Sequence, residues 1–244
     1  MTVPSSSNVG FRIFRDIQRP PRAVVEAFAK IETPYITDAM SRFGGMVDNI
    51  RPADDSMRCA GPAVTVRVAP GDNLMVYAAF EVARPGDVLV IEARGFTSVA
   101  QWGDHMSLVA QKLGLAGAVT DGSLRDLLGI RQIGFPVFAR PWVVPNGARR
   151  DGPGEINVPV AVGGVPVLPG DLVVADDHGV AVVPHADAEA VLLKAHAMIG
   201  SEPGKLREIR GGKPIPDWLA ETLRRKGVEV VDGRYDDPAR VRPS

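Results

Sequence analysis

Two aspartates and one arginine form the combination in this chain that is best suited to chemistry. Asp104 is followed, after twenty intervening residues, by the pair Arg125-Asp126. An arginine guanidinium binds a carboxylate through two parallel hydrogen bonds, and aspartate oxygens together with water can hold a hard divalent cation. These three residues are the minimum needed to bind a small carboxylate beside Mg²⁺, and they predict that kind of site.

The segment Gly103-Asp104-His105-Met106 adds backbone donors to these side chains. Glycine allows a ligand to approach the main chain closely, and the first N–H groups of a helix have no partner within the helix. If a helix starts near Gly103, its first turn offers hydrogen-bond donors to an anionic ligand.

Asp126 also has a purely structural interpretation. Ser123 and Asp126 have the spacing of a capping box, in which the later residue stabilises the start of its own helix. Arg125 favours the functional interpretation, because a cation in the first turn of a helix opposes the helix dipole. An anionic ligand would explain why an arginine stands there.

The elements that must position these residues alternate between strand and helix. Apolar runs predict three strands, at 88–93, 115–120 and 136–139. Apolar residues at helical spacing predict one helix starting near Gly103 and a second helix after the turn Asp121-Gly122-Ser123, with a stripe formed by Leu124, Leu127 and Leu128. Units of this kind have parallel strands, and their ligands bind beyond the carboxyl ends of the strands.

Tight turns mark the rest of the chain. Pro-Gly-Asp occurs at 70–72, 85–87 and 169–171. Proline presets φ for a turn and glycine supplies the positive φ that follows, so each tripeptide predicts a corner between one element and the next. Residues 176–179 predict a hairpin tip, which makes His178 a turn residue, and two amphipathic helices are expected between Pro21 and Phe43.

Composition excludes several classes of function. Lys+Arg at 28 against Asp+Glu at 29 leaves no basic excess for nucleic acid. No apolar run approaches the roughly 20 residues of a membrane helix, and the first 23 residues lack the apolar core of a secretory signal, so we expect a cytoplasmic protein without a membrane partner. The single cysteine, Cys59, rules out an internal disulfide.

Two long stretches around these motifs resemble a known family. The stretches are LAGAVTDGSLRDLLGIRQIGFPVFAR and GPGEINVPVAVGGVPVLPGDLVVADDHGVAVVP, and they follow Asp104 in the chain. Together with the spacing from Asp104 to Arg125-Asp126, they resemble the family that contains the ribonuclease regulator RraA and the class II 4-hydroxy-4-methyl-2-oxoglutarate aldolases. The resemblance covers roughly residues 20–200, which we expect to form one domain between an N-terminal segment (1–19) and a helical C-terminal extension (201–244) that packs on the domain or on a neighbouring subunit.

The resemblance implies a fold, an assembly and a set of roles. The fold is a compact α/β/β sandwich related to swivelling phosphohistidine-type domains, assembled as homotrimers or dimers of trimers. A Mg²⁺ or Mn²⁺ ion would sit on Asp126, with Asp104 reaching its waters. Arg125 would contact the pyruvyl oxygens, and the turn at Gly103 with the N–H groups of His105 and Met106 would hold the substrate carboxylate.

The implied activity is metal-dependent cleavage of a 4-hydroxy-2-oxo acid to pyruvate, with oxaloacetate decarboxylation open through the same enolate. Gly129 stands where the family's aldolases commonly have an acid, and this favours the alternative of a non-catalytic, RraA-type regulator that binds a ribonuclease. A phosphohistidine carrier would need His105 or His178 in a reactive loop. Glu155 and Asn157 lie in a loop that is expected either to approach the site or to stabilise a turn.

Overall fold

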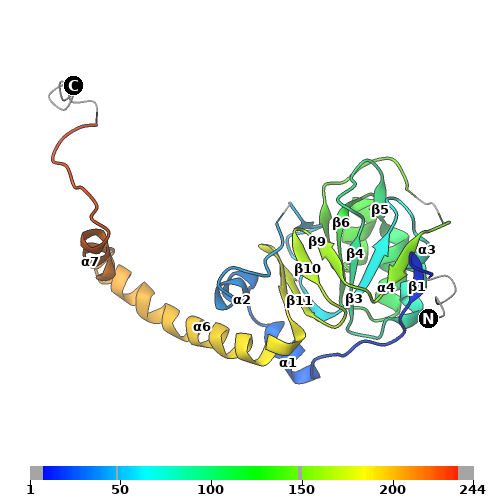
Figure 1. Cartoon of the computed structure of the whole chain (residues 1–244), viewed down its shortest axis with the longest axis horizontal. Helices are drawn as coiled ribbons and strands as arrows, with labels where there is room; N and C mark the ends of the chain where they lie inside the picture. Colours follow the sequence, from blue (N-terminus) through cyan, green and yellow to red (C-terminus); the bar gives the residue numbers. More distant parts are fainter. Residues whose placement is uncertain (1–7, 48, 148–149, 236–244) are drawn as a thin grey trace, which may run out of the picture. The chain divides into compact units, whose positions relative to one another are not determined.

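The computed structural model describes residues 8–47, 49–147 and 150–235. A large mixed sheet forms its centre (Figure 1). The strands run in the order β1 (Phe11–Ile13), β8 (Gly154–Ile156), β3 (Cys59–Val68), β4 (Val88–Glu92), β6 (Gly117–Leu124), β7 (Val137–Arg140) and β2 (Arg51–Pro52), with β5 (Ala100–Trp102) paired beside β6. β3, β4, β6 and β7 are parallel, as the alternation of strand and helix predicts.

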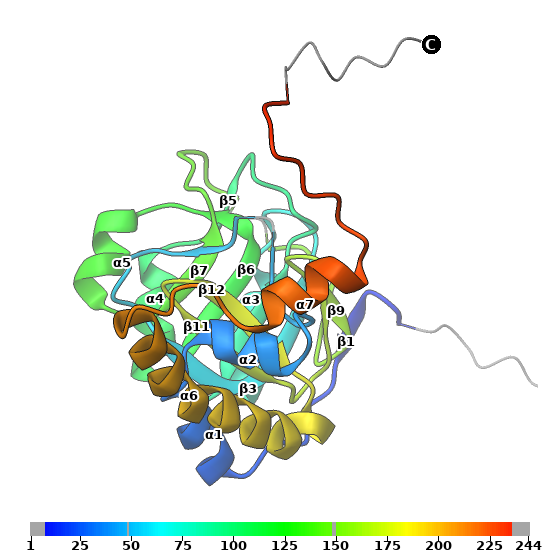
Figure 2. The ribbon, with the colours of Figure 1, turned by 90° about the vertical axis from the view of Figure 1, so that its left-hand side faces the viewer.

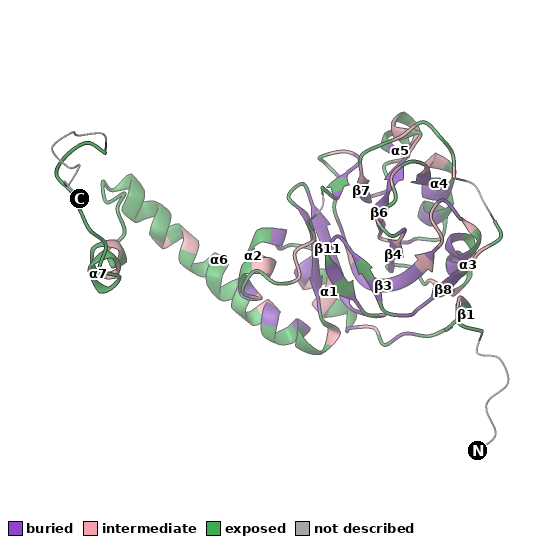
Figure 3. Cartoon of the chain, turned by 45° about the horizontal axis from the view of Figure 1, so that its top comes forward, coloured by how far each residue is buried: buried purple, intermediate pink, exposed green. Residues whose placement is uncertain are grey.

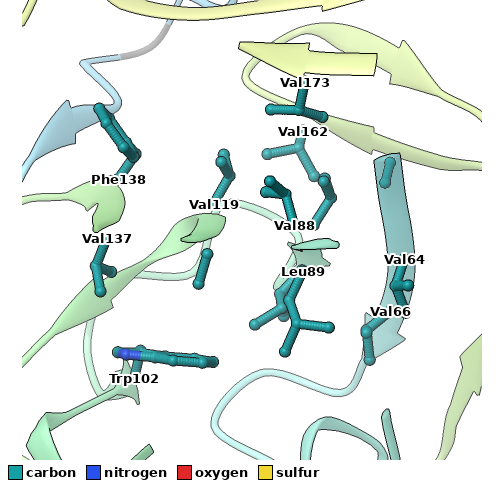
Figure 4. Packing of buried hydrophobic residues seen from close by; sticks show 14 of the residues in the cluster. Val64, Val66, Val88, Leu89, Trp102, Val119, Val137, Phe138, Val162 and Val173 are labelled. Carbon is teal, nitrogen blue, oxygen red and sulfur yellow. The ribbon is translucent and has the colours of Figure 1, made fainter. Parts of the chain in front are cut away.

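A second β layer and two groups of helices complete the α/β/β arrangement that the sequence predicts. β9 (Val160–Val162) pairs with β10 (Val165–Val167), and the hairpin of β11 (Leu172–Asp176) and β12 (Gly179–Val183) continues from the first half of β3. The helices that follow the parallel strands are α3 (Leu74–Val82), α4 (Asp104–Lys112) and α5 (Leu127–Ile133). In Figure 4, Val162 and Val173 of the second β layer lie beside Val88 of the main sheet.

A smaller apolar cluster lies on the outer side of the β11–β12 hairpin. α1 (Arg22–Phe28), α2 (Thr33–Ala39) and the start of α6 (Ala188–Arg210) pack there (Figure 2). Alternation decides which residues belong to which cluster, because Leu172 and Val174 contact these helices whereas Val173 and Ala175 face the main core.

The three Pro-Gly-Asp tripeptides form the predicted turns. In each, the aspartate N–H donates to the carbonyl three residues earlier, at 2.9–3.1 Å, and the glycine has φ between 74° and 90°. This is the geometry of a type II turn, in which the third residue must adopt positive φ. The aspartates Asp72, Asp87 and Asp171 are buried, so their carboxylates bond within the fold.

The strand β6 is longer than predicted. The expected turn at Asp121-Gly122-Ser123 lies inside it, and all three residues are buried. Asp121 accepts hydrogen bonds from the N–H groups of Ala93 (2.6 Å) and Gly95 (2.7 Å), which follow the neighbouring strand β4. Burial raises the pKa of the Asp121 carboxyl despite these two bonds. The prediction of a turn and a capping box at Ser123 is therefore wrong.

The chain divides into two compact units, with the boundary between Ile199 and Gly200. β1 lies within the expected N-terminal segment 1–19 but is part of the sheet of the first unit, paired with β8. The second unit contains the end of α6 and α7 (Trp218–Arg225), and both are largely exposed, as the green ribbon of Figure 3 shows. No helix among the described residues is long and apolar enough to cross a membrane.

Candidate active site

The site is built where β5 and β6 end side by side. Trp102 lies opposite Leu124 in the parallel pair, and the Arg125 N–H donates to the Trp102 carbonyl at 3.1 Å. Gly103 and Arg125 therefore leave adjacent strands at the same edge of the sheet. Ser107 stabilises this corner, since its hydroxyl accepts a bond from the Trp102 indole N–H (2.8 Å) and donates to the Gly103 carbonyl (3.1 Å).

A pocket of about 110 Å³ opens at this corner. It is lined by Asn73, Tyr77, Ala100, Gln101, Trp102, Gly103, Asp104, His105, Met106, Arg125, Asp126, Asn146 and Arg150. The fold thus brings together the six site residues that the sequence singles out, from the segments 103–106 and 125–126.

Asp126 is held in a particular backbone geometry. It adopts a left-handed conformation with φ 57° and ψ 38°, and it occupies the position just before α5 without capping that helix through its side chain. Its Oδ2 lies 3.2 Å from the Nε of Arg125. A Cβ on residue 103 would lie 2.9 Å from the same oxygen, so a side chain at 103 would force the Asp126 carboxylate to move.

The sequence suggests that Arg125 lies in the first turn of a helix, and the structure corrects this. β6 continues to Leu124 and α5 begins only at Leu127, so Arg125 lies between them. The guanidinium therefore does not oppose the dipole of a helix in which it lies. The guanidinium instead lies in a two-residue connection between strand and helix, next to the Asp126 carboxylate. Both side chains remain partly exposed to the pocket.

Asp104 begins α4 and contacts α5. Its Oδ1 accepts a hydrogen bond from the His105 N–H at 2.7 Å. A Cβ on Gly129 would lie 2.8 Å from Asp104 Oδ2 and 2.9 Å from its Cβ. Gly129 is therefore in direct contact with Asp104, and any side chain at 129 would displace the carboxylate. The His105 N–H is already bonded to Asp104, so a ligand carboxylate would have to compete with that bond.

Sequence reasoning missed four other residues that line the pocket, Asn73, Tyr77, Asn146 and Arg150. These residues lie in α3, just before it, and in the loop after β7. No motif or spacing connects them with Asp104 or Arg125 in the sequence. β5, the strand that leads to Gly103, was also missed, because three residues are too few to show a pattern.

The donor set is compatible with a magnesium-like ion that keeps most of its water. Among the described residues, no three side chains of His, Cys, Asp or Glu lie close enough together to hold a metal. Asp104 and Asp126 are both hard oxygen donors at the same pocket. Mg²⁺ is typically bound by one or two carboxylates, with waters and substrate oxygens completing its shell.

Other sequence candidates lie away from this pocket. Glu155 is buried in β8 and pairs with Arg12, whose hydrogen bond lowers the pKa of the Glu155 carboxyl. Asn157 donates to the Phe14 carbonyl at 2.7 Å. His178 lies at the predicted β11–β12 hairpin tip, where its carbonyl accepts a bond from Arg51. These residues therefore stabilise the fold.

Comparison with known proteins assigns the family. The model described as "RraA-like: Aldolase/RraA" matches residues 33–182. The chain belongs to the RraA-like family. The resemblance predicted from the sequence is thus confirmed, and the family match includes both β5 and β6 with the pocket residues that follow them.

Relatives within the RraA-like family carry both kinds of name. A Halalkalibacterium halodurans protein, named provisionally as a 4-hydroxy-4-methyl-2-oxoglutarate aldolase, is 40% identical over 76% of this chain and 88% of its own length. The 4-hydroxy-4-methyl-2-oxoglutarate aldolase of Thermus thermophilus is 34% identical over 52% of this chain and 76% of its own. The crystal structure of Streptomyces coelicolor RraAS2, described as a member of the RNase ES inhibitor RraA family, superposes with a TM-score of 0.69 at 29% identity, covering 79% of this chain and 99% of that one.

Proposed function

We propose that this RraA-like protein is a lyase that cleaves 4-hydroxy-2-oxo acids of the 4-hydroxy-4-methyl-2-oxoglutarate type to pyruvate. The observation that carries the proposal is the convergence of Arg125, Asp126 and Asp104 on one pocket at the end of β5 and β6. Aldolase-named relatives at 34–40% identity support the same reaction class.

We infer that Asp126 binds a Mg²⁺ or Mn²⁺ ion directly and that Asp104 contacts the waters of that ion. A bound divalent ion would supply Lewis-acid stabilisation of the oxygen on which negative charge develops. The partly exposed carboxylate of Asp126, beside the Arg125 guanidinium, is the group through which the chain would hold such an ion.

The chain's own residues have complementary parts in the retro-aldol reaction. The C4 hydroxyl gives its proton to a water held by Asp104, the C3–C4 bond breaks, and its electron pair forms the enolate of pyruvate. Arg125 stabilises the enolate oxygen and orients the substrate. Protonation at C3 then gives pyruvate, and the other half leaves as a carbonyl compound. Loss of CO₂ from oxaloacetate would pass through the same enolate.

Pyruvate release tests the proposal. Purified protein is incubated with 4-hydroxy-4-methyl-2-oxoglutarate or oxaloacetate and Mg²⁺, with and without EDTA, and pyruvate is measured. We expect turnover that EDTA abolishes and that Arg125→Ala lowers by 100-fold or more, because oxyanion stabilisation is worth about 10²–10³ in rate. The absence of metal-dependent turnover, or full activity of Arg125→Ala, would refute the proposal.

A non-catalytic role as an RraA-type regulator is the second candidate. Gly129 supports it, because the side chain that family aldolases commonly carry at this position is absent and Asp104 lies against the glycine. Capture of a ribonuclease by the purified protein, without pyruvate release, would decide for this role. We propose homotrimers or dimers of trimers and a cytoplasmic location, which sedimentation velocity and cell fractionation would measure.

A further inference from the structure

The pocket continues beyond the corner that would hold a 2-oxo acid. Tyr77 and Arg150 line it together with Asp126, and the same two residues, with Leu74, line a second hollow of about 380 Å³. The two hollows therefore share one wall. A substrate bound at Arg125 and Asp126 has room to extend past Tyr77 and Arg150.

Arg150 has no partner among the residues that the structure describes. No hydrogen bond or ion pair engages its guanidinium there, whereas Arg125, which lines the same pocket, is paired with Asp126. An exposed guanidinium that lines a pocket and is not paired with a carboxylate of the described residues is suited to bind an anionic ligand group.

The segment that carries Arg150 is fixed by buried hydrogen bonds. The N–H groups of Asp151 and Gly152 both donate to Asp72 Oδ2 at 2.9 Å, and Asp72 Oδ1 accepts the Leu74 N–H at the start of α3. Asp72 is only 2% exposed. This carboxylate therefore binds the backbone next to Arg150 to the helix that carries Tyr77.

Gln101 connects the same wall to the catalytic corner. Its side-chain oxygen accepts the Gly71 N–H at 3.1 Å, and its amide donates to the Asp72 carbonyl at 3.0 Å. Tyr77 packs edge-on against Phe80, which packs edge-on against Trp102 of β5. The positions of Tyr77 and Arg150 are thus set by the strand that also positions Gly103.

The charges lining the pocket favour a dianion. Asp104 and Asp126 are balanced by Arg125 and Arg150, so the formal charge of these four groups is zero. The divalent ion of the proposed function would leave two positive charges to be neutralised. A 2-oxo dicarboxylate carries two negative charges, one at each end, and a 2-oxo monocarboxylate carries only one.

We propose that Arg150, assisted by the Tyr77 hydroxyl, binds the second carboxylate of a 2-oxo dicarboxylic acid and so determines specificity for dicarboxylate over monocarboxylate substrates. This inference rests on the proposed function for the orientation of the substrate, with its oxo-acid end at Arg125. Arg150 would thus bind the half of the substrate that leaves as the carbonyl product, while Arg125 binds the half that becomes pyruvate.

Equilibrium binding of two unreactive acids tests the assignment. 2-Oxoglutarate and 2-oxopentanoate differ at C5, which is a carboxylate in one and a methyl group in the other, and neither has the 4-hydroxyl needed for cleavage. Titration calorimetry with Mg²⁺ measures both acids on the full chain, on Arg150→Met, on Tyr77→Phe and on the control Arg84→Met. Arg84 is an exposed arginine paired with Asp16, and it does not line the pocket.

We expect the wild type and Arg84→Met to bind 2-oxoglutarate about tenfold or more tightly than 2-oxopentanoate, as a charged hydrogen-bonded pair allows. Arg150→Met should reduce that ratio to threefold or less by weakening 2-oxoglutarate alone, and Tyr77→Phe should reduce it partly. An unchanged ratio in Arg150→Met, or equal weakening of both acids, would overturn the assignment.

The same experiment separates this inference from the proposed function. A preference for the dicarboxylate that depends on Arg150, without pyruvate release from 4-hydroxy-4-methyl-2-oxoglutarate, would keep the subsite and refute the lyase. Pyruvate release with no dependence of the binding ratio on Arg150 would keep the lyase and refute the subsite. Failure of the wild type to bind either acid, together with no pyruvate release from 4-hydroxy-4-methyl-2-oxoglutarate, would refute both.

Discussion

Replacing Asp72 with asparagine is expected to loosen one wall of the pocket. The Asp72 carboxylate accepts three backbone N–H groups at 2.9 Å, from Leu74 on one oxygen and from Asp151 and Gly152 on the other. An asparagine has one acceptor oxygen, so its NH₂ group must face a backbone donor on one side. At least one of the three hydrogen bonds is lost, and the others change from charged to neutral acceptors.

The magnitude follows from those bonds. A hydrogen bond to a charged group contributes about 1.5–3 kcal/mol and a neutral one about 1 kcal/mol. Asp151 is exposed and Gly152 is half-buried, so water can replace part of what is lost. We expect Asp72→Asn to lower the free energy of unfolding by about 2–4 kcal/mol, measured by urea denaturation at pH 7.

Asp171→Asn is a matched control for this change. Asp171 ends another Pro-Gly-Asp turn, is buried, and accepts the N–H groups of Leu168 (2.8 Å) and His185 (3.0 Å), but it does not line this pocket. Both variants should lose similar stability. Only Asp72→Asn should speed amide hydrogen exchange at residues 150–152 and weaken 2-oxoglutarate binding.

Two results would refute the reasoning about Asp72. One is a loss of less than about 0.5 kcal/mol, which would mean that the three N–H groups find equally good partners without the carboxylate. The other is faster exchange at 150–152 in Asp171→Asn as well, which would mean that general destabilisation, and not the Asp72 bonds, controls that segment.

Three further predictions concern two substitutions and the reactivity of one cysteine. Glu155→Gln should lower the free energy of unfolding by about 1 kcal/mol at pH 7, because the partly exposed Arg12 lowers the pKa of Glu155 below its ordinary value of 4.5. The stabilisation by this pair is present above pH 4.5 and is lost as the pH falls through the lowered pKa. The urea midpoints of variant and wild type should therefore converge in acid, and a constant gap between them would contradict the prediction. Gly129→Ala should lower the free energy of unfolding by about 0–2 kcal/mol, because overpacking against Asp104 costs about 1–3 kcal/mol and the higher helix propensity of alanine returns about 1 kcal/mol. Gly204→Ala, in open space within α6, is the control and should lose no stability. A Gly129→Ala variant more stable than the wild type would disprove the tight contact. Burial raises the pKa of the Cys59 thiol to about 12, so the native protein should not react with a thiol reagent at pH 8, and rapid labelling without denaturant would disprove its burial.

Local turn chemistry made much of the fold predictable. The Pro-Gly-Asp corners follow from the φ preferences of proline and glycine, and the parallel unit follows from apolar periodicity. The segment Asp121-Gly122-Ser123 has turn-forming residues but lies in β6, because Asp121 and Ser123 bond to residues that follow β4. Tertiary hydrogen bonds therefore overrode a local preference that the sequence shows correctly.

The candidate site was predictable in part for a related reason. Asp104, Arg125 and Asp126 follow strands that are neighbours in the sheet, and topology alone brings them together. Tyr77 and Arg150 lie in segments that the bonds of Asp72 and Gln101 hold at the same pocket. In the sequence, Asp72 is the aspartate of a Pro-Gly-Asp turn and Gln101 is a single glutamine. No pattern there indicates which groups they hydrogen-bond.

The left-handed backbone of Asp126 limits how its carboxylate can be probed. Alanine at this position would remove the charge and also place a residue that disfavours positive φ where the chain has φ 57°. An alanine variant would therefore combine backbone strain with loss of the proposed metal ligand, and its inactivity would have two explanations. Asparagine tolerates the left-handed region and has nearly the same shape, so Asp126→Asn is the substitution that isolates the negative charge.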